Sequence, residues 1–218
     1  MLLGVGVTPV TANVSNSIGL FPGSFVGAYG YRRELTGQRR RAIILGIASA
    51  LGGAGGAVLL LQLPASAFKA IVPVLIILAL VLVVFGPRIT AWLRTRGREP
   101  SLEIHWPLFV TTFGTGVYGG YFGAAQGVLV MGLLGLLLAE SLQRQNALKN
   151  VLVGVVNLVS SIVFVATAEV DWAAVGLVAA GSITGGWLGA HIGRRLSPAV
   201  LRGVIVVIGI AAIVKLLV

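Results

Sequence analysis

Long uncharged apolar runs alternate with short basic clusters along the whole of this 218-residue chain. Most of these runs approach the roughly 20 residues that a helix needs to cross the hydrocarbon core of a membrane. Since 57% of the residues are hydrophobic and only 10% are charged, the pattern predicts an all-α integral membrane protein, a polytopic helical bundle. The predicted membrane helices cover residues 10–29, 42–61, 70–85, 150–168, 172–193 and 203–218.

One further run, residues 106–139, carries no charge from end to end, and its length is too great for one crossing and too small for two full ones. Its middle, residues 114–123, is rich in glycine and is therefore poor helix-forming material. The run predicts a broken or re-entrant hairpin that enters and leaves the membrane on the same side. Non-helical backbone at that depth requires cover by protein or by a water-filled cavity.

The two halves of the chain repeat one another at a constant offset in residue number, the offset that takes Asn13 to Asn146 (146 − 13 = 133). At the same offset Lys69 is matched by Arg202, a change that preserves the charge. The other identical pairs are Ser49/Ser182, Gly52/Gly185, Gly53/Gly186, Gly56/Gly189, Ala57/Ala190 and Leu63/Leu196. Chance similarity between two helices rich in Gly and Ala is the alternative, but the ungapped offset favours a duplicated unit, as in many transporters.

The distribution of charge predicts that the two repeats are inverted. Loops rich in Lys and Arg face the cytoplasm, and 14 of the 16 Lys and Arg residues lie in residues 32–41, 86–105, 139–149 and 194–202. With the hairpin returning to its own side, helix 42–61 runs outward and its counterpart, helix 172–193, runs inward.

The predicted organisation is a first transmembrane repeat, residues 1–87, a cytoplasmic linker, residues 88–105, and a second transmembrane repeat, residues 106–218. At the repeat offset, the counterpart of Trp106 would fall at position −27, so the first repeat is predicted to be N-terminally incomplete. Either the true start codon lies further upstream, which is the favoured explanation, or the chain is a truncated or divergent form.

Composition excludes several functions. The net charge of +10 does not indicate nucleic-acid binding, because the basic residues sit between apolar runs as cytoplasmic loops do. The chain has no cysteine, which excludes disulfides, thiol catalysis and Cys-ligated metal centres. Neither a His-Glu-x-x-His nor a Gly-x-Ser-x-Gly motif occurs. We therefore expect no enzyme activity and no cofactor or metal. The expected partners are the lipid bilayer and a small anionic substrate, and homo-oligomer formation stays open.

Amide and hydroxyl groups near two predicted helix starts, together with a lysine, form the candidate substrate site. Helix N-termini, such donors and a partly buried cation favour an anion. The candidate substrate-binding residues are Asn13, Asn16, Ser17, Tyr121, Gln126, Asn146, Lys149 and Asn150, with Asn157 two turns deeper. The alternative is that these groups cap helices or bond between helices. The paired glycines are interpreted as helix-packing surfaces.

Several short motifs, in their order and spacing, resemble the sulfite exporter TauE/SafE family of membrane proteins. They are Pro9-x-x-Ala12-Asn13-x-x-Asn16 followed by Pro22-Gly23, the glycine-rich residues 52–56 before Leu61-Gln62-Leu63-Pro64, residues 118–123, and Asn146-x-x-Lys149-Asn150. The resemblance covers nearly the whole chain and implies a multi-pass protein of the bacterial inner membrane. It further implies a transporter of sulfite or organosulfonates. The missing first hairpin is a departure from the family pattern.

The expected function is therefore export or equilibration of a small anion, with sulfite or an organosulfonate as the expected substrate. Two alternatives stay open: transport of another small organic anion, and a non-transporting membrane scaffold or accessory subunit. In the transporter, access would alternate as one half rocks against the other.

Overall fold

The computed structural model describes residues 8–64, 101–123 and 126–192, with isolated positions between 67 and 92. The helices in these parts are α1 (Pro9–Gly30), α2 (Arg39–Gln62), α4 (Trp106–Tyr121), α5 (Gln126–Leu137), α6 (Leu142–Thr167) and α7 (Trp172–Ile192). The helices predicted over residues 10–29, 42–61 and 172–193 are confirmed as α1, α2 and α7. The one predicted over 203–218 lies outside the described residues, as does most of 70–85, whose described positions are helical.

Within the described residues, α2, α6 and α7 are long and apolar enough to cross a membrane. Helix α1 is long enough but is not one of these three, and it carries polar residues such as Asn13 and Asn16 on its first turns. The helix also contains Pro22, which cannot donate a backbone hydrogen bond to the preceding turn, yet it continues to Gly30. The described helices are therefore those of a multi-pass membrane protein.

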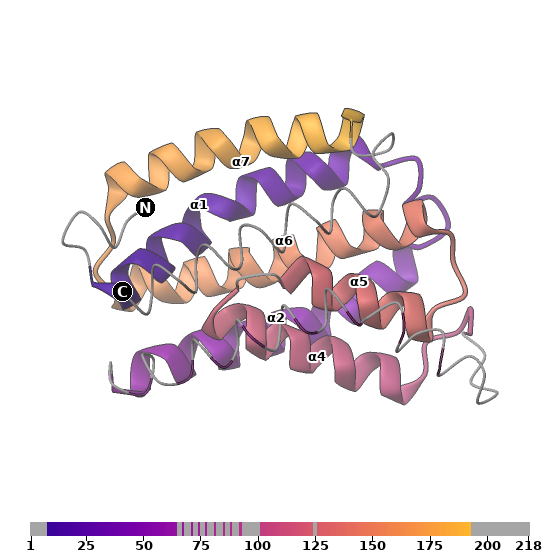
Figure 1. The fold of residues 1–218 in the computed structure, drawn as a ribbon, viewed down its shortest axis with the longest axis horizontal. Coiled ribbons are helices and arrows are strands. Elements are labelled where there is room, and N and C mark those ends of the chain that lie inside the picture. Colours follow the sequence, from indigo (N-terminus) through magenta and orange to yellow (C-terminus); the bar gives the residue numbers. More distant parts are fainter. Residues whose placement is uncertain are drawn as a thin grey trace.

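The helices form two packed pairs joined through α6 (Figure 1). Helix α1 packs along α7, helix α2 packs along α4, and α6 contacts both α1 and α2. Helices α1 and α6 run in opposite directions, and so do α2 and α7 (Figure 1).

Glycine lets α2 and α4 approach until their backbones touch. A Cβ on Gly56 would lie 2.1 Å from the carbonyl oxygen of Val117, and one on Gly120 would lie 2.1 Å from that of Gly53. No side chain fits at those distances, so the contact depends on glycine from both helices. The same contact corrects one expectation: residues 114–121 are helical although they are rich in glycine, because packing against α2 outweighs their weak helix propensity.

The second pair, α1 and α7, is built by a related contact. A Cβ on Gly186 of α7 would lie 2.4 Å from the carbonyl oxygen of Gly23 in α1. In the other half, a Cβ on Gly53 of α2 would lie 3.2 Å from the Cα of Val156 in α6. Gly53 and Gly186 are separated by the repeat offset, and so are Gly23 and Val156. Equivalent positions therefore make a close contact in both halves.

The chain reverses between α4 and α5, as the hairpin prediction requires. The break follows Tyr121, and Gly123 adopts a φ of 74°, a left-handed conformation that residues other than glycine rarely adopt. Both ends of the hairpin lie side by side, since Ser101 and Leu138 form an isolated parallel bridge. The break lies at the end of the glycine-rich segment 114–123, in the middle of the uncharged run 106–139.

The prediction of a loop over residues 139–149 is wrong for most of that range. Helix α6 begins at Leu142, and the side chain of Ser141 caps it by accepting a hydrogen bond from the backbone N–H of Arg144. The first two turns bury Gln145, Ala147 and Leu148. Burial of this face makes the segment helical although it is polar in composition.

Candidate functional site

The break between α4 and α5 is stabilised by a side chain from α1. The amide nitrogen of Asn13 donates to the carbonyl oxygen of Tyr121 at 3.1 Å, and the hydroxyl of Ser17 donates to the carbonyl oxygen of Asn13 at 3.0 Å. The last carbonyl groups of a helix lack partners within that helix. Asn13 therefore acts as a cap for α4 from a distant part of the chain.

Gln126, the first residue of α5, is buried beside the same break, with 2% of its surface exposed. Its Nε2 donates to the carbonyl oxygen of Thr115 at 3.2 Å, whereas its Oε1 has no hydrogen-bond partner among the described residues. The side chain lies directly over Gly119, where an added Cβ would approach it to 2.3 Å. A buried amide oxygen without a donor is costly in an apolar interior, so this oxygen is available to a hydrogen-bond donor that enters the site.

Lys149 of α6 brings a positive charge to the start of α5. Its Cδ would lie 3.5 Å from a Cβ on Gly127, the second residue of α5. The side chain is half-buried, and no hydrogen bond or ion pair joins it to another residue in the described parts of the chain. A helix start carries a partial positive charge. The lysine and the helix therefore present positive potential to the same region.

The remaining predicted residues do not complete one ring. Asn150 lies against Gly27, whose added Cβ would be 3.2 Å from the amide nitrogen of Asn150. Gly27 lies almost four turns beyond Asn13 in α1, a distance of about 21 Å along the helix. Asn16 and Asn146 are half-buried, and no side-chain hydrogen bond joins either to another described residue. The structure therefore gathers Asn13, Ser17, Tyr121, Gln126 and Lys149 around the break and places Asn150 elsewhere, whereas Asn16 and Asn146 make no polar contact with this group among the described residues.

The expected helix start at residues 146–150 is also corrected. These residues occupy the second and third turns of α6, so their backbone N–H groups are used within the helix. The helix start near Lys149 is that of α5. Asn146, Lys149 and Asn150 can contribute only side chains to a ligand.

Sequence reasoning missed two buried hydroxyl groups close to the repeat contacts. Ser160 of α6 is 1% exposed and donates to the carbonyl oxygen of Gly53, and Thr115 supplies the carbonyl group that holds Gln126. The signal for Ser160 was present, because it lies three residues after Asn157 and shares the polar face of α6.

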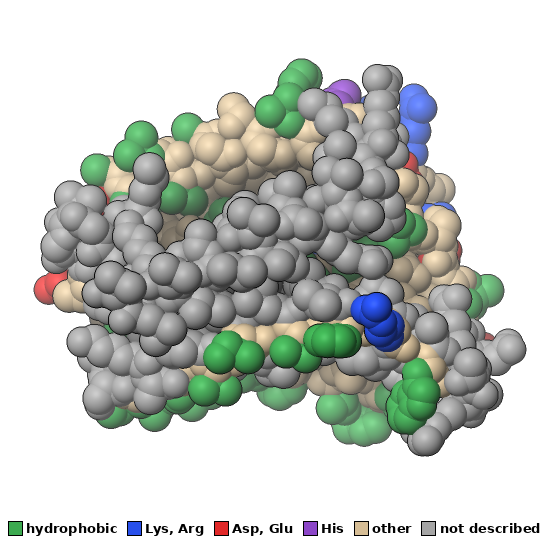
Figure 2. Space-filling model, viewed as in Figure 1, with side chains coloured by type: hydrophobic (Ala, Val, Ile, Leu, Met, Phe, Trp, Pro, Cys, Tyr) green, Lys and Arg blue, Asp and Glu red, His purple; other side chains and the backbone are tan. Residues whose placement is uncertain are grey.

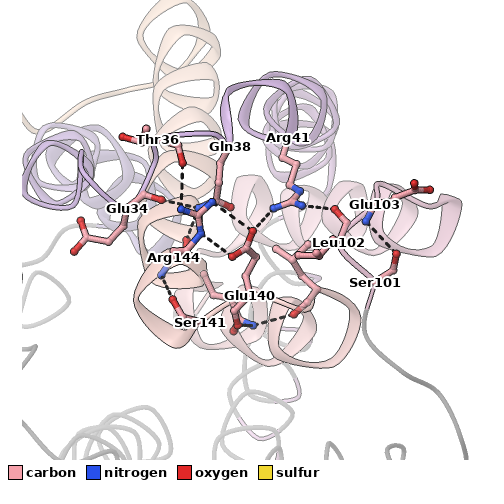
Figure 3. A network of polar contacts seen from close by, with 12 residues as sticks. Glu34, Thr36, Gln38, Arg41, Ser101, Leu102, Glu103, Glu140, Ser141 and Arg144 are labelled. Atoms are coloured by element: carbon pink, nitrogen blue, oxygen red, sulfur yellow. Dashed lines mark hydrogen bonds and ion pairs between the residues drawn. The ribbon is translucent and has the colours of Figure 1, made fainter.

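A charged network lies at the end of the bundle where α2 and α6 begin (Figure 3). Glu140 pairs with Arg41 at 2.5 Å and with Arg144 at 2.6 Å. Arg144 also donates to the carbonyl oxygen of Thr36, and the buried Gln38 donates to that of Arg144. Burial raises the pKa of the Glu140 carboxyl, but hydrogen bonds and attraction from Arg144 and Arg41 outweigh burial, so the pKa is lowered overall. The two arginines therefore hold segments together, beyond the topological role that the sequence suggested.

One apolar groove among the described residues does not fit an anion. It has a volume of about 350 Å³ and is lined by Leu59, Leu63, Ile71, Gly114, Val117, Tyr118 and Tyr121. These residues offer almost no polar surface. The candidate site is therefore the group of polar side chains around the break.

These observations define a class: an all-helical, multi-pass membrane protein with a broken hairpin that its neighbours cover. Residues 1–216 match the family described as Sulfite exporter TauE/SafE, so the chain belongs to this family, as its motifs suggested. The family comprises membrane transporters of sulfur-containing anions. No curated protein and no solved structure matches the chain.

Proposed function

We propose that this protein exports or equilibrates small sulfur-containing anions, sulfite or organosulfonates, across the bacterial inner membrane. The observation that carries the proposal is the half-buried Lys149 beside the first residues of α5. A cation next to a helix start is a favourable environment for an oxyanion. Irregular backbone at this depth is typical of the discontinuous helices that bind substrates in transporters.

The roles of the other polar groups follow from their positions. Gln126 supplies one free amide oxygen, which can accept a hydrogen bond from a protonated oxyanion or from a water molecule that accompanies it. Asn13 holds the carbonyl end of α4, so it positions the break and leaves the substrate to Lys149 and Gln126.

For the transport cycle we propose two inverted repeats, residues 1–87 and 106–218, joined by a linker over residues 88–105. The opposite directions of α1 and α6 and of α2 and α7 support this organisation, as do the matching contacts at Gly53 and Gly186. One repeat would rock against the other about contacts of this kind. Figure 2 shows the visible Lys and Arg side chains gathered over one half of this face, and we assign that end to the cytoplasm.

The test is sulfite flux from loaded proteoliposomes with Lys149→Met. We expect the initial rate to fall at least tenfold because the substrate loses its cation. Lys149→Arg should retain part of the rate, and Arg40→Met, which removes an exposed charge from α2, is the matched control. Asn146→Ala tests the second half of the predicted set.

The flux measurements can be interpreted as follows, provided that the variants elute as folded protein. Unchanged flux in Lys149→Met would remove the proposed site, and loss of flux in Asn146→Ala alone would move the site to that asparagine. Loss of flux in Arg40→Met to the same extent would show a general effect of charge. Absence of sulfite and organosulfonate flux in the unmodified protein would contradict the proposed substrates and favour the scaffold alternative.

A further inference from the structure

Helix α7 combines the greatest exposure with the lowest hydropathy of the three candidate spans. In its most apolar window 11% of residues are buried, against 50% in α2, and its mean hydropathy is 1.4, against 2.1 in α2. A helix whose surface faces lipid on most sides is expected to be strongly apolar. The exposed face of α7 therefore has a composition that suits another helix better than it suits lipid.

The open face consists of three glycines in succession, at four-residue spacing. Gly181, Gly185 and Gly189 are exposed, and a Cβ added to any of them would meet no described atom within 4 Å. Glycines at this spacing allow close approach between membrane helices. Small residues alone do not identify what binds there, and the occupant is identified by the other half of the molecule.

The counterparts of this face on α2 are fully covered. Ala48, Gly52 and Gly56 precede the three glycines by the repeat offset, and all three are buried. The cover is the backbone of α4: a Cβ on Gly52 would lie 2.3 Å from the carbonyl oxygen of Phe113. Equivalent surfaces thus bind a helix in one half and no described residue in the other.

The glycine faces of α2 and α7 are equivalent in orientation, as the contact on the opposite side of each helix shows. Gly53 faces Val156 while Gly52 and Gly56 face α4. Gly186 faces Gly23, so Gly185 and Gly189 point to the side where a counterpart of α4 would lie.

A polar group supports the same location. Asn13 donates to the last carbonyl of α4, whereas Asn146, its counterpart, makes no side-chain hydrogen bond within the described parts of the chain. A helix placed on α7 as α4 is placed on α2 would bring its last carbonyl group to the amide of Asn146.

We propose that the face of α7 formed by Gly181, Gly185 and Gly189 binds a second transmembrane helix with the chemistry of α4. That helix is apolar, carries small residues at four-residue spacing and ends in a break whose carbonyl group accepts a hydrogen bond from Asn146. The proposal uses the repeat organisation but makes no assumption about the substrate.

The test uses a synthetic peptide with the sequence of residues 106–123 in which Val117 is replaced by cysteine. The chain has no cysteine of its own, so Gly189→Cys provides a single thiol at the position equivalent to Gly56, which contacts Val117. We expect oxidation in lipid nanodiscs to cross-link the peptide to Gly189→Cys at least ten times faster than to Ile183→Cys. Ile183 is exposed on another side of α7 and is the matched control.

A second variant tests the packing itself. Adding Gly185→Leu to Gly189→Cys should reduce cross-linking at least tenfold, because the leucine side chain occupies the contact surface. Equal rates at positions 183 and 189 would overturn the proposal, since they would indicate random collision in the bilayer. Cross-linking between two Gly189→Cys chains without peptide would assign the face to a second copy and would also overturn it. Neither readout depends on anion flux, so this proposal and the proposed function can fail independently.

Discussion

Helices α2 and α7 have similar sequences but different surroundings. Comparing them separates the properties of a glycine-rich helix from the effect of its glycines on packing against a neighbouring helix. On α2, the glycines at 52 and 56 bring the backbone of α4 within reach. On α7, the equivalent glycines at 185 and 189 touch nothing that the structure describes. The same residues therefore make a backbone contact in one half and no contact with a described residue in the other.

The largest expected difference between the two helices comes from filling the glycine positions. Gly56→Leu should destabilise the folded protein by about 3 kcal/mol, because its side chain would overlap the backbone of Val117 and Tyr121. Gly189→Leu should change stability by less than roughly 0.5 kcal/mol in the isolated chain. Thermal denaturation in detergent, followed by size-exclusion chromatography, measures both. Equal destabilisation would mean that α7 is covered as tightly as α2.

The second difference concerns the charged network that holds the start of α2. Glu140→Gln should cost roughly 2 kcal/mol, because Arg41 and Arg144 lose their partner, although partial exposure reduces the effect. Arg40→Gln, which removes an exposed charge next to Arg41 in α2, is a control with little expected effect.

The pH dependence of this variant follows from the lowered pKa of Glu140. The stabilisation is complete above the ordinary pKa of 4.5 and is lost as pH falls through the lower pKa of the folded state. Denaturation temperatures of wild type and Glu140→Gln should therefore differ at pH 7 and converge as the pH falls through the lowered pKa of Glu140. A difference that stays constant down to acidic pH would contradict the ion-pair explanation.

The smallest expected difference is between the two equivalent asparagines. Asn13→Ala removes the cap of α4 and should cost about 1 kcal/mol. Asn146→Ala should change the free energy of unfolding by only a few tenths of this value, because no described partner is lost. Chemical denaturation of the two variants side by side provides the comparison, and a larger cost at Asn146 would reverse it.

The periodicity and charge of the sequence were sufficient for the helices but not for their contacts. Uncharged runs of membrane-spanning length predicted α1, α2 and α7, and the constant offset between the repeats identified glycines that make close contacts. The first turns of α6 were missed, because Arg144 and Lys149 suggested a loop. Burial of Gln145 and Leu148 makes that segment helical, and burial depends on the tertiary structure.

The candidate site was predictable in its residue types and only partly in its arrangement. Lys149, Gln126 and Tyr121 were selected for their chemistry, and the structure places them near one break. Asn150 was selected for its neighbours in sequence but lies against Gly27 in the other part of α1. The reason is geometric: helices that run in opposite directions place equivalent residues at opposite ends, so similarity between repeats does not imply proximity.

The bridge between Ser101 and Leu138 has a consequence for how the chain enters the bilayer during synthesis. Because both ends of the α4–α5 hairpin return to one side, no charged residue between Glu103 and Glu140 has to be translocated. The hairpin can therefore insert from the side of the ribosome as a single apolar unit. Under the proposed topology, its insertion would leave unchanged the orientation of α1 and α2, so the second half of the protein would begin from a defined side of the membrane.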